Sequence, residues 1–158
     1  MKLYLPRPEE LLSLHSDHYF RGWRLESGAL PARSLLRQGL QTRDFDSLPY
    51  RWSIPYLIVV REPGLVVGSI GGKGLLPDED EVEIAYNIAA AYRRRGYARE
   101  AMGMLQELAR KDSLALLAHV EPDNTPSKKL LEKARFALET VFRLPDSLDL
   151  ERWRWLPD

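Results

Sequence analysis

The most constraining feature of the chain is a strand-like run that leads through an arginine-rich loop into a helix. Apolar residues alternate over 82–88, whereas those of 98–110 recur at helical spacing. The loop between them reads Arg93-Arg94-Arg95-Gly96-Tyr97-Ala98. The first N–H groups of a helix have no partners within it, its macrodipole places partial positive charge there, and Gly96 lets a ligand approach the main chain. We therefore expect this loop to bind an anion, and specifically a pyrophosphate.

The remaining apolar patterns predict one α+β domain, 1–158, with a mixed sheet. Strands are expected at 3–5, 56–60, 65–70, 82–88, 114–120, 136–142 and 148–155, and helices at 8–20, 32–40, 98–110 and 127–135. Thr125 is the expected N-cap of the last helix, and turns are expected at 77–81 and 144–147. A poorly patterned stretch, 21–53, and its borders hold aromatic residues that either line a pocket or fill the core, namely Tyr19, Phe20, Trp23, Tyr50 and Trp52.

Composition excludes several kinds of site and partner. Lys plus Arg and Asp plus Glu both number 23, so the net charge is zero and a general nucleic-acid binder is not expected. The chain has no cysteine, which excludes disulfides, cysteine nucleophiles and thiolate metal sites. His15 and His18 lie near Asp17, but no further ligands complete a cluster, so no metal is expected. Without a signal-peptide pattern or an apolar run of about 20 residues, we expect a cytoplasmic protein that does not enter a membrane.

A glycine-rich segment, Gly71-Gly72-Lys73-Gly74, superficially resembles a nucleotide-binding phosphate loop. Such a loop needs a glycine where this chain has Val67 and a hydroxyl residue where it has Gly74, and it needs a helix directly after it. A general nucleotide-binding protein is therefore not expected. The glycines are expected instead to ease a bend or bulge late in a strand.

Two ordered segments resemble the signatures of the GCN5-related N-acetyltransferases, the GNAT superfamily. Residues 84–98 resemble motif A of that family, whose pattern Arg/Gln-x-x-Gly-x-Gly/Ala is matched by Arg93, Gly96 and Ala98. Residues 120–136 resemble the second signature, and their Asn-x-x-Ser form is typical of the branch that includes ribosomal-protein N-terminal acetyltransferases. The resemblance covers residues 55–155, while the first 50 residues match only in the type of element.

This resemblance implies a mixed, mainly antiparallel, splayed β-sheet with helices on both faces. It also implies acetyl-CoA as the donor and a primary amine as the acceptor. Residues 1–54 would supply the acceptor-side helices and residues 55–158 the acetyl-CoA-binding core. The main chain of Arg93, Arg94, Arg95, Gly96, Tyr97 and Ala98 would hold the pyrophosphate. Ile88 and Ala90 would pair with the pantetheine arm, and Asn124 would hold that arm from the other side.

An amine attacks only when it is neutral, so a base is needed. Glu83 lies on the strand that leads to the donor site, where it either removes the proton, through a water if needed, or faces solvent. Glu81 is the reserve candidate. His119 lies in the middle of a strand pattern and is expected to be structural rather than catalytic.

The reaction also needs donors for the oxyanion and for the departing sulfur. The N–H of Ile88 is expected to stabilise the oxyanion. Many family members have a tyrosine where this chain has Leu131, so Ser127 is expected to contact the sulfur, or else only to cap a helix. Arg135 stands where a glycine is usual, which leaves the geometry of the following turn open.

The acceptor is not specified by the sequence. A protein N-terminus, an antibiotic-like amine, a polyamine and an amino acid all remain candidates. The alternative to an enzyme is a catalytically inactive module that binds acyl-CoA, for which Leu131 in the tyrosine position is the main support. A homodimer would be allowed if Trp153 and Trp155 were exposed.

Overall fold

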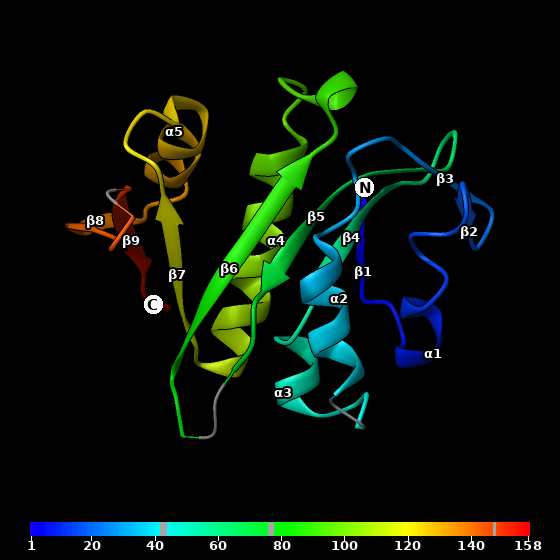
Figure 1. Cartoon of the computed structure of the whole chain (residues 1–158), viewed down its shortest axis with the longest axis horizontal. Helices are drawn as coiled ribbons and strands as arrows, with labels where there is room; N and C mark the ends of the chain where they lie inside the picture. Colours follow the sequence, from blue (N-terminus) through cyan, green and yellow to red (C-terminus); the bar gives the residue numbers. More distant parts are fainter. Residues whose placement is uncertain (42–43, 76–77, 147) are drawn as a thin grey trace.

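The computed structural model describes residues 1–41, 44–75, 78–146 and 148–158, and shows helices packed on an open mixed sheet (Figure 1). The strand order is β1-β4-β5-β6-β7-β9-β8, and a β2–β3 hairpin joins through parallel pairing of β3 with β5. The strands are β1 Lys2–Tyr4, β2 Tyr19–Phe20, β3 Trp23–Leu25, β4 Pro55–Val60, β5 Leu65–Gly72, β6 Glu81–Ile88, β7 Ala115–Val120, β8 Ala137–Arg143 and β9 Asp149–Trp155. The helices are α1 Pro8–Leu11, α2 Arg33–Leu40, α3 Leu48–Arg51, α4 Tyr97–Asp112 and α5 Thr125–Lys133, with a 3₁₀ turn, η1, at Ala90–Tyr92.

The sheet splays between β6 and β7. These parallel strands pair only from Glu81 opposite Ala115 to Glu83 opposite Leu117. Beyond those residues they diverge, and Figure 1 shows β6 and β7 leaning apart like the arms of a V. Most of the other strand pairs are antiparallel. The expected splayed, mainly antiparallel sheet is therefore confirmed.

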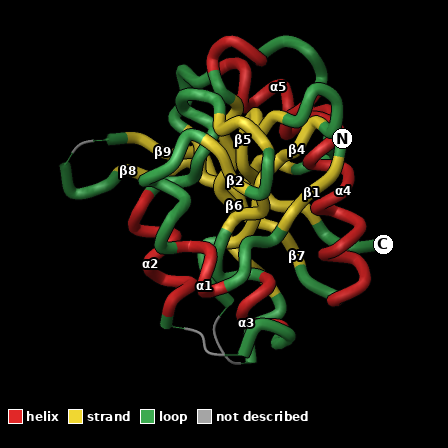
Figure 2. Tube along the Cα trace, turned by 90° about the vertical axis from the view of Figure 1, so that its right-hand side faces the viewer, coloured by secondary structure: helices red, strands yellow, loops and turns green. Residues whose placement is uncertain are grey.

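Helices cover both faces of the sheet, as Figure 2 shows with α4 on one side and α1 and α2 on the other. One apolar core lies under α4 and includes Met102, Leu105 and Leu116. A second core lies under α1 and α2 and includes Leu14, Leu36 and Leu57. The two cores explain the apolar periodicity of the strands, since alternate side chains point to opposite faces.

Helix α4 forms where the helical spacing predicts it. Its apolar face buries Ala101, Met102, Leu105 and Ala109. Gly96 precedes its first residue with φ +86°, a left-handed conformation that a glycine adopts without strain. The helix ends at Ser113, which is also left-handed. The predicted loop and the long helix that follows it are therefore both present.

The predicted helix 8–20 is wrong. Helix α1 ends at Leu11, and the short strands β2 and β3 follow it. Phe20 and Trp23 pack against the ring of Tyr4 on β1, with ring centroids 5.7 and 5.3 Å away. These contacts between separate segments stabilise a hairpin and outweigh the local helical pattern.

Helix boundaries elsewhere differ from expectation where polar side chains cap them. The chain forms an unpredicted short helix, α3, whose N-cap Ser47 accepts a hydrogen bond from the Tyr50 N–H at 3.2 Å. The N-cap of α5 is Asn124 rather than Thr125, so this helix begins two residues earlier than 127. The predicted turns at 77–81 and 144–147 include Pro77 and Ser147, which lie outside the described residues.

Two of the aromatic residues that were candidates to line a pocket fill the core instead. Tyr50 and Trp52 are 0% exposed, so the pocket-lining interpretation is wrong for them. Trp153 and Trp155 are also buried and offer no surface for a homodimer. The exposed apolar side chains of that region are instead those of Leu138 and Val141 on the edge strand β8, and Leu148 and Leu156.

The glycines of 71–74 serve close packing rather than a bulge. A Cβ on Gly72 would overlap the main-chain carbonyl of Trp52, and one on Gly71 would approach the Pro55 Cα to 2.7 Å. The irregularity in the β4–β5 pairing lies instead at Ile58 and Val59. The strand therefore needs glycine here because another segment crosses its surface.

Across the described ranges, every helix is too short or too polar to cross a membrane.

Candidate functional site

A cavity of about 420 Å³ lies where β6 and β7 separate. Its walls come from both strands, from the end of β5 and from the start of α5. It is lined by Lys73, Glu83, Ile84, Ala85, Tyr86, Ala118, His119, Val120, Glu121, Asn124, Ser127 and Leu150. The cavity therefore brings together Glu83, Asn124 and Ser127, which the sequence placed in separate elements.

At the narrow end of the cavity, one carboxylate oxygen receives two neighbours. Lys73 Nζ lies 2.8 Å from Glu83 Oε1, and His119 Nδ1 lies 2.9 Å from the same oxygen. Glu83 is the last β6 residue paired with β7, and its partner on β7 is Leu117. His119 lies two residues beyond Leu117 on the same strand. Side chains two residues apart in a strand point to the same face. The strand register thus places the imidazole beside the carboxylate.

The environment of Glu83 favours its ionised form. Burial alone would raise the pKa of this carboxyl, but hydrogen bonds from Lys73 and His119 outweigh burial, and the pKa is lowered from its ordinary value. An ionised carboxylate only accepts hydrogen bonds. The contact therefore favours a His119 ring with a proton on Nδ1. Glu83 is accordingly a half-buried anion with two donors on one oxygen rather than an outward-facing carboxylate.

Glu81, the reserve candidate for the base, lies in a separate network of ion pairs on the same face of the sheet. Its carboxylate is 3.0 Å from Arg154 Nη2 and 3.5 Å from Arg152 Nη2. Glu139 of β8 approaches both arginines as well, at 3.2 Å from Arg152 and 3.6 Å from Arg154. Two guanidinium groups thus hold Glu81, and it does not line the cavity.

The opposite wall of the cavity presents hydroxyl and amide groups. Asn124 Oδ1 accepts a hydrogen bond from the Ser127 N–H at 3.3 Å, which caps α5. Tyr86 projects from β6 beside the Ser127 hydroxyl, and its own buried hydroxyl makes no hydrogen bond of good geometry among the described residues. Burial raises the pKa of Tyr86, an effect that the neighbouring Ser127 hydroxyl offsets only in part. An unpaired buried hydroxyl facing a cavity is a group that a ligand can satisfy.

The arginine-rich loop lies at the wide end of the V, where β6 leads through η1 into α4. Arg94 and Gly96 have φ values of +62° and +86°. A Cβ built on Gly96 would meet no atom within 4 Å, so the space in front of its main chain is open. Within the described residues, none of Arg93, Arg94 and Arg95 pairs with a carboxylate. Their charges are therefore available to an anion.

The arginine side chains are also tied to the loop itself. Arg93 Nε donates to the Ile88 carbonyl at 3.0 Å, and the Arg95 guanidinium lies 5.1 Å from the centre of the Tyr92 ring. Ile88 is the last residue of β6 and lies opposite Gly68 in the pairing register. Ala90 is exposed and begins η1. These expected donor-side residues thus follow one another along the chain from β6 to α4, and none of them lines the cavity.

Sequence reasoning missed Lys73 and Tyr86 and assigned His119 to the structural class. Lys73 was considered only as part of a glycine-rich segment, yet pairing of Gly72 with Ile84 brings it next to Glu83. Tyr86 could have been noticed from the alternation of β6, which places its side chain on the face of the strand opposite that of Glu83. No local signal joins His119 to Glu83, because that contact depends on the pairing of two strands separated by a helix.

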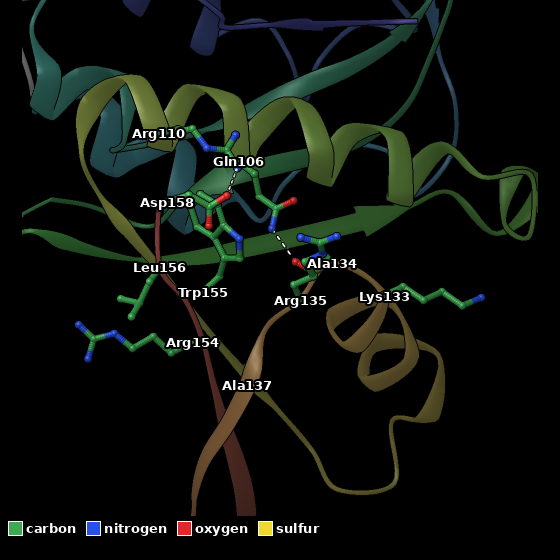
Figure 3. Close-up of a pocket in the computed structure, with 10 residues that line it drawn as sticks. All are labelled: Gln106, Arg110, Lys133, Ala134, Arg135, Ala137, Arg154, Trp155, Leu156 and Asp158. Atoms are coloured by element: carbon green, nitrogen blue, oxygen red, sulfur yellow. Dashed lines mark hydrogen bonds and ion pairs between the residues drawn. The ribbon is translucent and has the colours of Figure 1, made fainter.

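A second cavity, also of about 420 Å³, lies between α4, the end of α5, the start of β8 and the end of β9 (Figure 3). Gln106 donates to the Ala134 carbonyl at 2.7 Å along one wall, and Arg110 lies 3.5 Å from Asp158 along another. Arg135 lines it with φ +63°, so this arginine adopts the left-handed conformation for which the family uses glycine. No predicted site residue lies here.

Comparisons with known proteins identify relatives of the chain. The chain is 34% identical over 111 residues to the uncharacterized N-acetyltransferase YjdG of Bacillus subtilis (strain 168), a match that covers 67% of this chain and 60% of YjdG. It is 31% identical over 90 residues to the uncharacterized N-acetyltransferase p20 of Bacillus licheniformis, covering 56% of this chain and 51% of p20. The chain thus matches little more than half the length of these relatives.

Solved structures share the fold over nearly the whole chain. Ard1 from Thermoplasma volcanium superposes with a TM-score of 0.68 at 16% identity, covering 99% of this chain and 97% of that one. A putative ribosomal-protein-serine acetyltransferase from Vibrio cholerae gives 0.61 at 19% identity, covering 98% and 92%. A family model described as an acetyltransferase (GNAT) domain matches residues 6–137. The chain therefore belongs to the GNAT family of acetyltransferases.

Proposed function

We propose that the protein transfers an acetyl group from acetyl-CoA to a primary amine, that of a protein N-terminus or of a small molecule. The observation that carries this proposal is the V between β6 and β7. It has the N-terminus of α4 at its wide end and the Glu83–His119 pair at its narrow end. A long donor with an anionic end and a reactive end fits such a path.

The wide end suits the pyrophosphate of CoA. The first N–H groups of α4 lack partners within the helix and carry the positive end of its dipole. The open space in front of Gly96 admits a ligand to these groups, and the three arginines before it add positive charge. We expect the main-chain N–H groups to bind the phosphates and the side chains to contribute less, since Arg93 and Arg95 already contact their own loop.

The arms of the V suit the pantetheine chain. Beyond Glu83, β6 has no strand partner on its β7 side, so main-chain groups toward Ile88 and Ala90 can pair with an extended ligand. From the other arm, Asn124 uses its oxygen to cap α5, and its amide nitrogen remains to donate. The Tyr86 hydroxyl, buried and unpaired in the described structure, supplies a further polar contact.

The residues at the narrow end suit direct attack of an amine on the thioester through a tetrahedral intermediate. Farther along β6, the N–H of Ile88 is expected to stabilise the oxyanion. Leu131 is fully buried in the core, so Ser127 provides the hydroxyl for the departing sulfur. An α-amino group, with a reference pKa of about 7.7–8.0, is easier to deprotonate than a lysine at about 10.4.

The proposal is tested by measuring the release of free CoA from acetyl-CoA with a panel of amines. The panel should contain peptides with free N-termini and blocked lysines, a polyamine, an amino acid and an aminoglycoside. Saturable CoA release with a matching acetyl mass on one amine is expected. Tight CoA binding without turnover on any amine would favour an acyl-CoA-binding module instead. Failure to bind CoA at all would refute the proposed donor.

A further inference from the structure

We propose that His119 is the catalytic base for the acceptor amine and that Glu83 positions it. This inference rests on the proposed function, because it assigns the proton transfer of that reaction. It also departs from the sequence-based expectation, which gave the role of base to Glu83 and a structural role to His119. Three features of the structure support the exchange of roles: the orientation of the ring, the partners of the carboxylate and the location of the pair.

The hydrogen bond to Glu83 fixes which ring nitrogen can accept a proton. His119 Nδ1 lies 2.9 Å from the Glu83 carboxylate, and this contact favours a neutral ring with its proton on Nδ1 and its lone pair on Nε2. No described group hydrogen bonds to Nε2, and His119 lines the cavity. A histidine that contacts a carboxylate through one nitrogen and lines a cavity, with its other nitrogen unpaired among the described residues, has the arrangement of a general base.

The partners of Glu83 make it a poor base. Lys73 and His119 both donate to its Oε1, and these hydrogen bonds stabilise the anion. A proton delivered to the other oxygen, Oε2, would remove the negative charge that both neighbours stabilise and so weaken both contacts. Catalysis by proton transfer is most efficient when the acceptor's pKa lies near the working pH, a range that imidazole covers and a stabilised carboxylate does not.

The location of the pair matches where an acceptor must enter. His119 lies on the face of the sheet opposite α4 and α5, since its neighbours Ala118 and Val120 belong to the core beneath those helices. The Phe142 ring meets the imidazole edge-on, with centroids 5.6 Å apart at 89°. The imidazole is therefore held on two sides, by Glu83 and by Phe142, while the His119 side chain remains 23% exposed. The donor can occupy the V, and the amine can approach from this open face.

The charged groups around the imidazole come from every neighbouring element. They are Glu81 and Glu83 on β6, Lys73 after β5, Glu121 after β7, Arg152 and Arg154 on β9, and Glu139 on β8. Glu81 and Glu139 are paired with the two arginines, and Lys73 is paired with Glu83. Most of the charges around the ring are therefore already paired, and Glu83 is its direct partner.

The proton transfer can be written with all atoms balanced. The neutral amine nitrogen forms a bond to the thioester carbon, and one N–H proton passes to Nε2 of His119. The C–S bond then breaks, and sulfur leaves with the bonding pair as a thiolate. The imidazolium returns its proton to the thiolate or to solvent, which yields the acetylated amine, CoA and the original neutral histidine.

The test compares His119→Gln and Glu83→Gln with wild type. His18→Gln serves as the matched control, since His18 directly precedes β2, at the edge of Figure 1 opposite β7. For each protein, the dissociation constant of acetyl-CoA is measured first, and then kcat/KM for the best amine across pH 5.5–9. We expect acetyl-CoA affinity to be unchanged throughout, and the rate of His119→Gln to fall about 100-fold or more.

The pH profile separates a base from a merely structural residue. We expect His119→Gln to lose the acidic limb of the profile and Glu83→Gln to keep a shifted limb with a smaller loss. Added imidazole should restore activity to His119→Ala in a saturable way. The proposal is overturned if His119→Gln stays within about threefold of wild type, or if Glu83→Gln loses the limb while His119→Gln retains it.

A second measurement does not depend on turnover. Nitrogen-15 NMR of the histidine ring should show the neutral form protonated at Nδ1, and Glu83→Gln should change the Nδ1 signal. A neutral ring protonated at Nε2 would overturn the proposal. If wild type binds acetyl-CoA but acetylates no amine, the proposed function fails by itself, and the NMR result still decides the orientation of His119.

Discussion

Replacing Gly96 by aspartate tests whether the arginine-rich loop binds a pyrophosphate. Gly96 has φ +86°, and a Cβ there meets no atom within 4 Å, so a side chain would enter open space without a clash. The cost to folding is therefore limited to the left-handed backbone, about 1 kcal/mol for a residue with a β-carbon, and aspartate and asparagine tolerate this region best. For a chain of this length, that corresponds to a fall in Tm of about 2–4 °C.

The effect on binding should be much larger than the effect on folding. A carboxylate at Gly96 would lie roughly 5 Å from a bound phosphate, where two unit charges repel by about 3 kcal/mol at an effective dielectric constant near 20. That free energy corresponds to a rise in Kd of roughly 100- to 300-fold. Gly96→Asn is the matched control, because it has the same shape and backbone strain without the charge. We expect it to weaken binding by only a few fold.

Both variants are measured by calorimetric titration with CoA and by thermal unfolding without ligand. A large loss for Gly96→Asp, a small loss for Gly96→Asn and similar Tm values for the two would support the charge argument. Equal affinities for Gly96→Asp and wild type would show that the loop does not face the phosphates. Equal losses for both variants would show that main-chain geometry, and not charge, governs binding.

Three further predictions concern stability. Gly103→Ala should raise the free energy of unfolding by about 0.5–1 kcal/mol in urea, because nothing lies near its Cβ position on α4, whereas Gly72→Ala should lower it by about 2 kcal/mol through overlap with Trp52. Glu83→Gln should lower the free energy of unfolding at pH 7, because the pKa of Glu83 is lowered in the fold and its ionised form therefore stabilises the protein. The difference from wild type should disappear as the pH falls through and below 4.5, where Glu83 becomes protonated. A difference that does not depend on pH would contradict this. Tyr86→Phe should leave unliganded stability unchanged or slightly higher in urea but reduce stabilisation by CoA, and a large loss without ligand would show that the hydroxyl is already paired.

The central part of the fold could be predicted because its signals are local. Alternation over β6, the glycine before α4 and the helical spacing within α4 each depend on neighbouring residues. The early chain could not be predicted in the same way. Phe20 and Trp23 form strands because they pack on Tyr4, and the helix-like pattern around them carries no trace of that contact. Pairing between distant segments determined the structure there.

The candidate site likewise has one part that local sequence could predict and one part that it could not. Its proposed donor side includes a loop and a helix start that are contiguous in sequence, so Arg93 and Gly96 could be named in advance. The contact of His119 with Glu83 and Lys73 arises from the registers of β5, β6 and β7. Register is set by the packing of whole strands, and one residue of slippage would move His119 to the opposite face. Sequence spacing alone could therefore not identify the pair.

The short pairing of β6 with β7 also has a consequence for hydrogen exchange. Beyond Glu83 and Leu117, the main-chain amides on the inner edges of the two strands have no strand partner, although they belong to the centre of the sheet. Central strands ordinarily hold the most slowly exchanging amides of a protein. Here the inner-edge amides should exchange quickly in the free protein and slow markedly once an extended ligand pairs with them, so that amide protection maps the course of the ligand residue by residue.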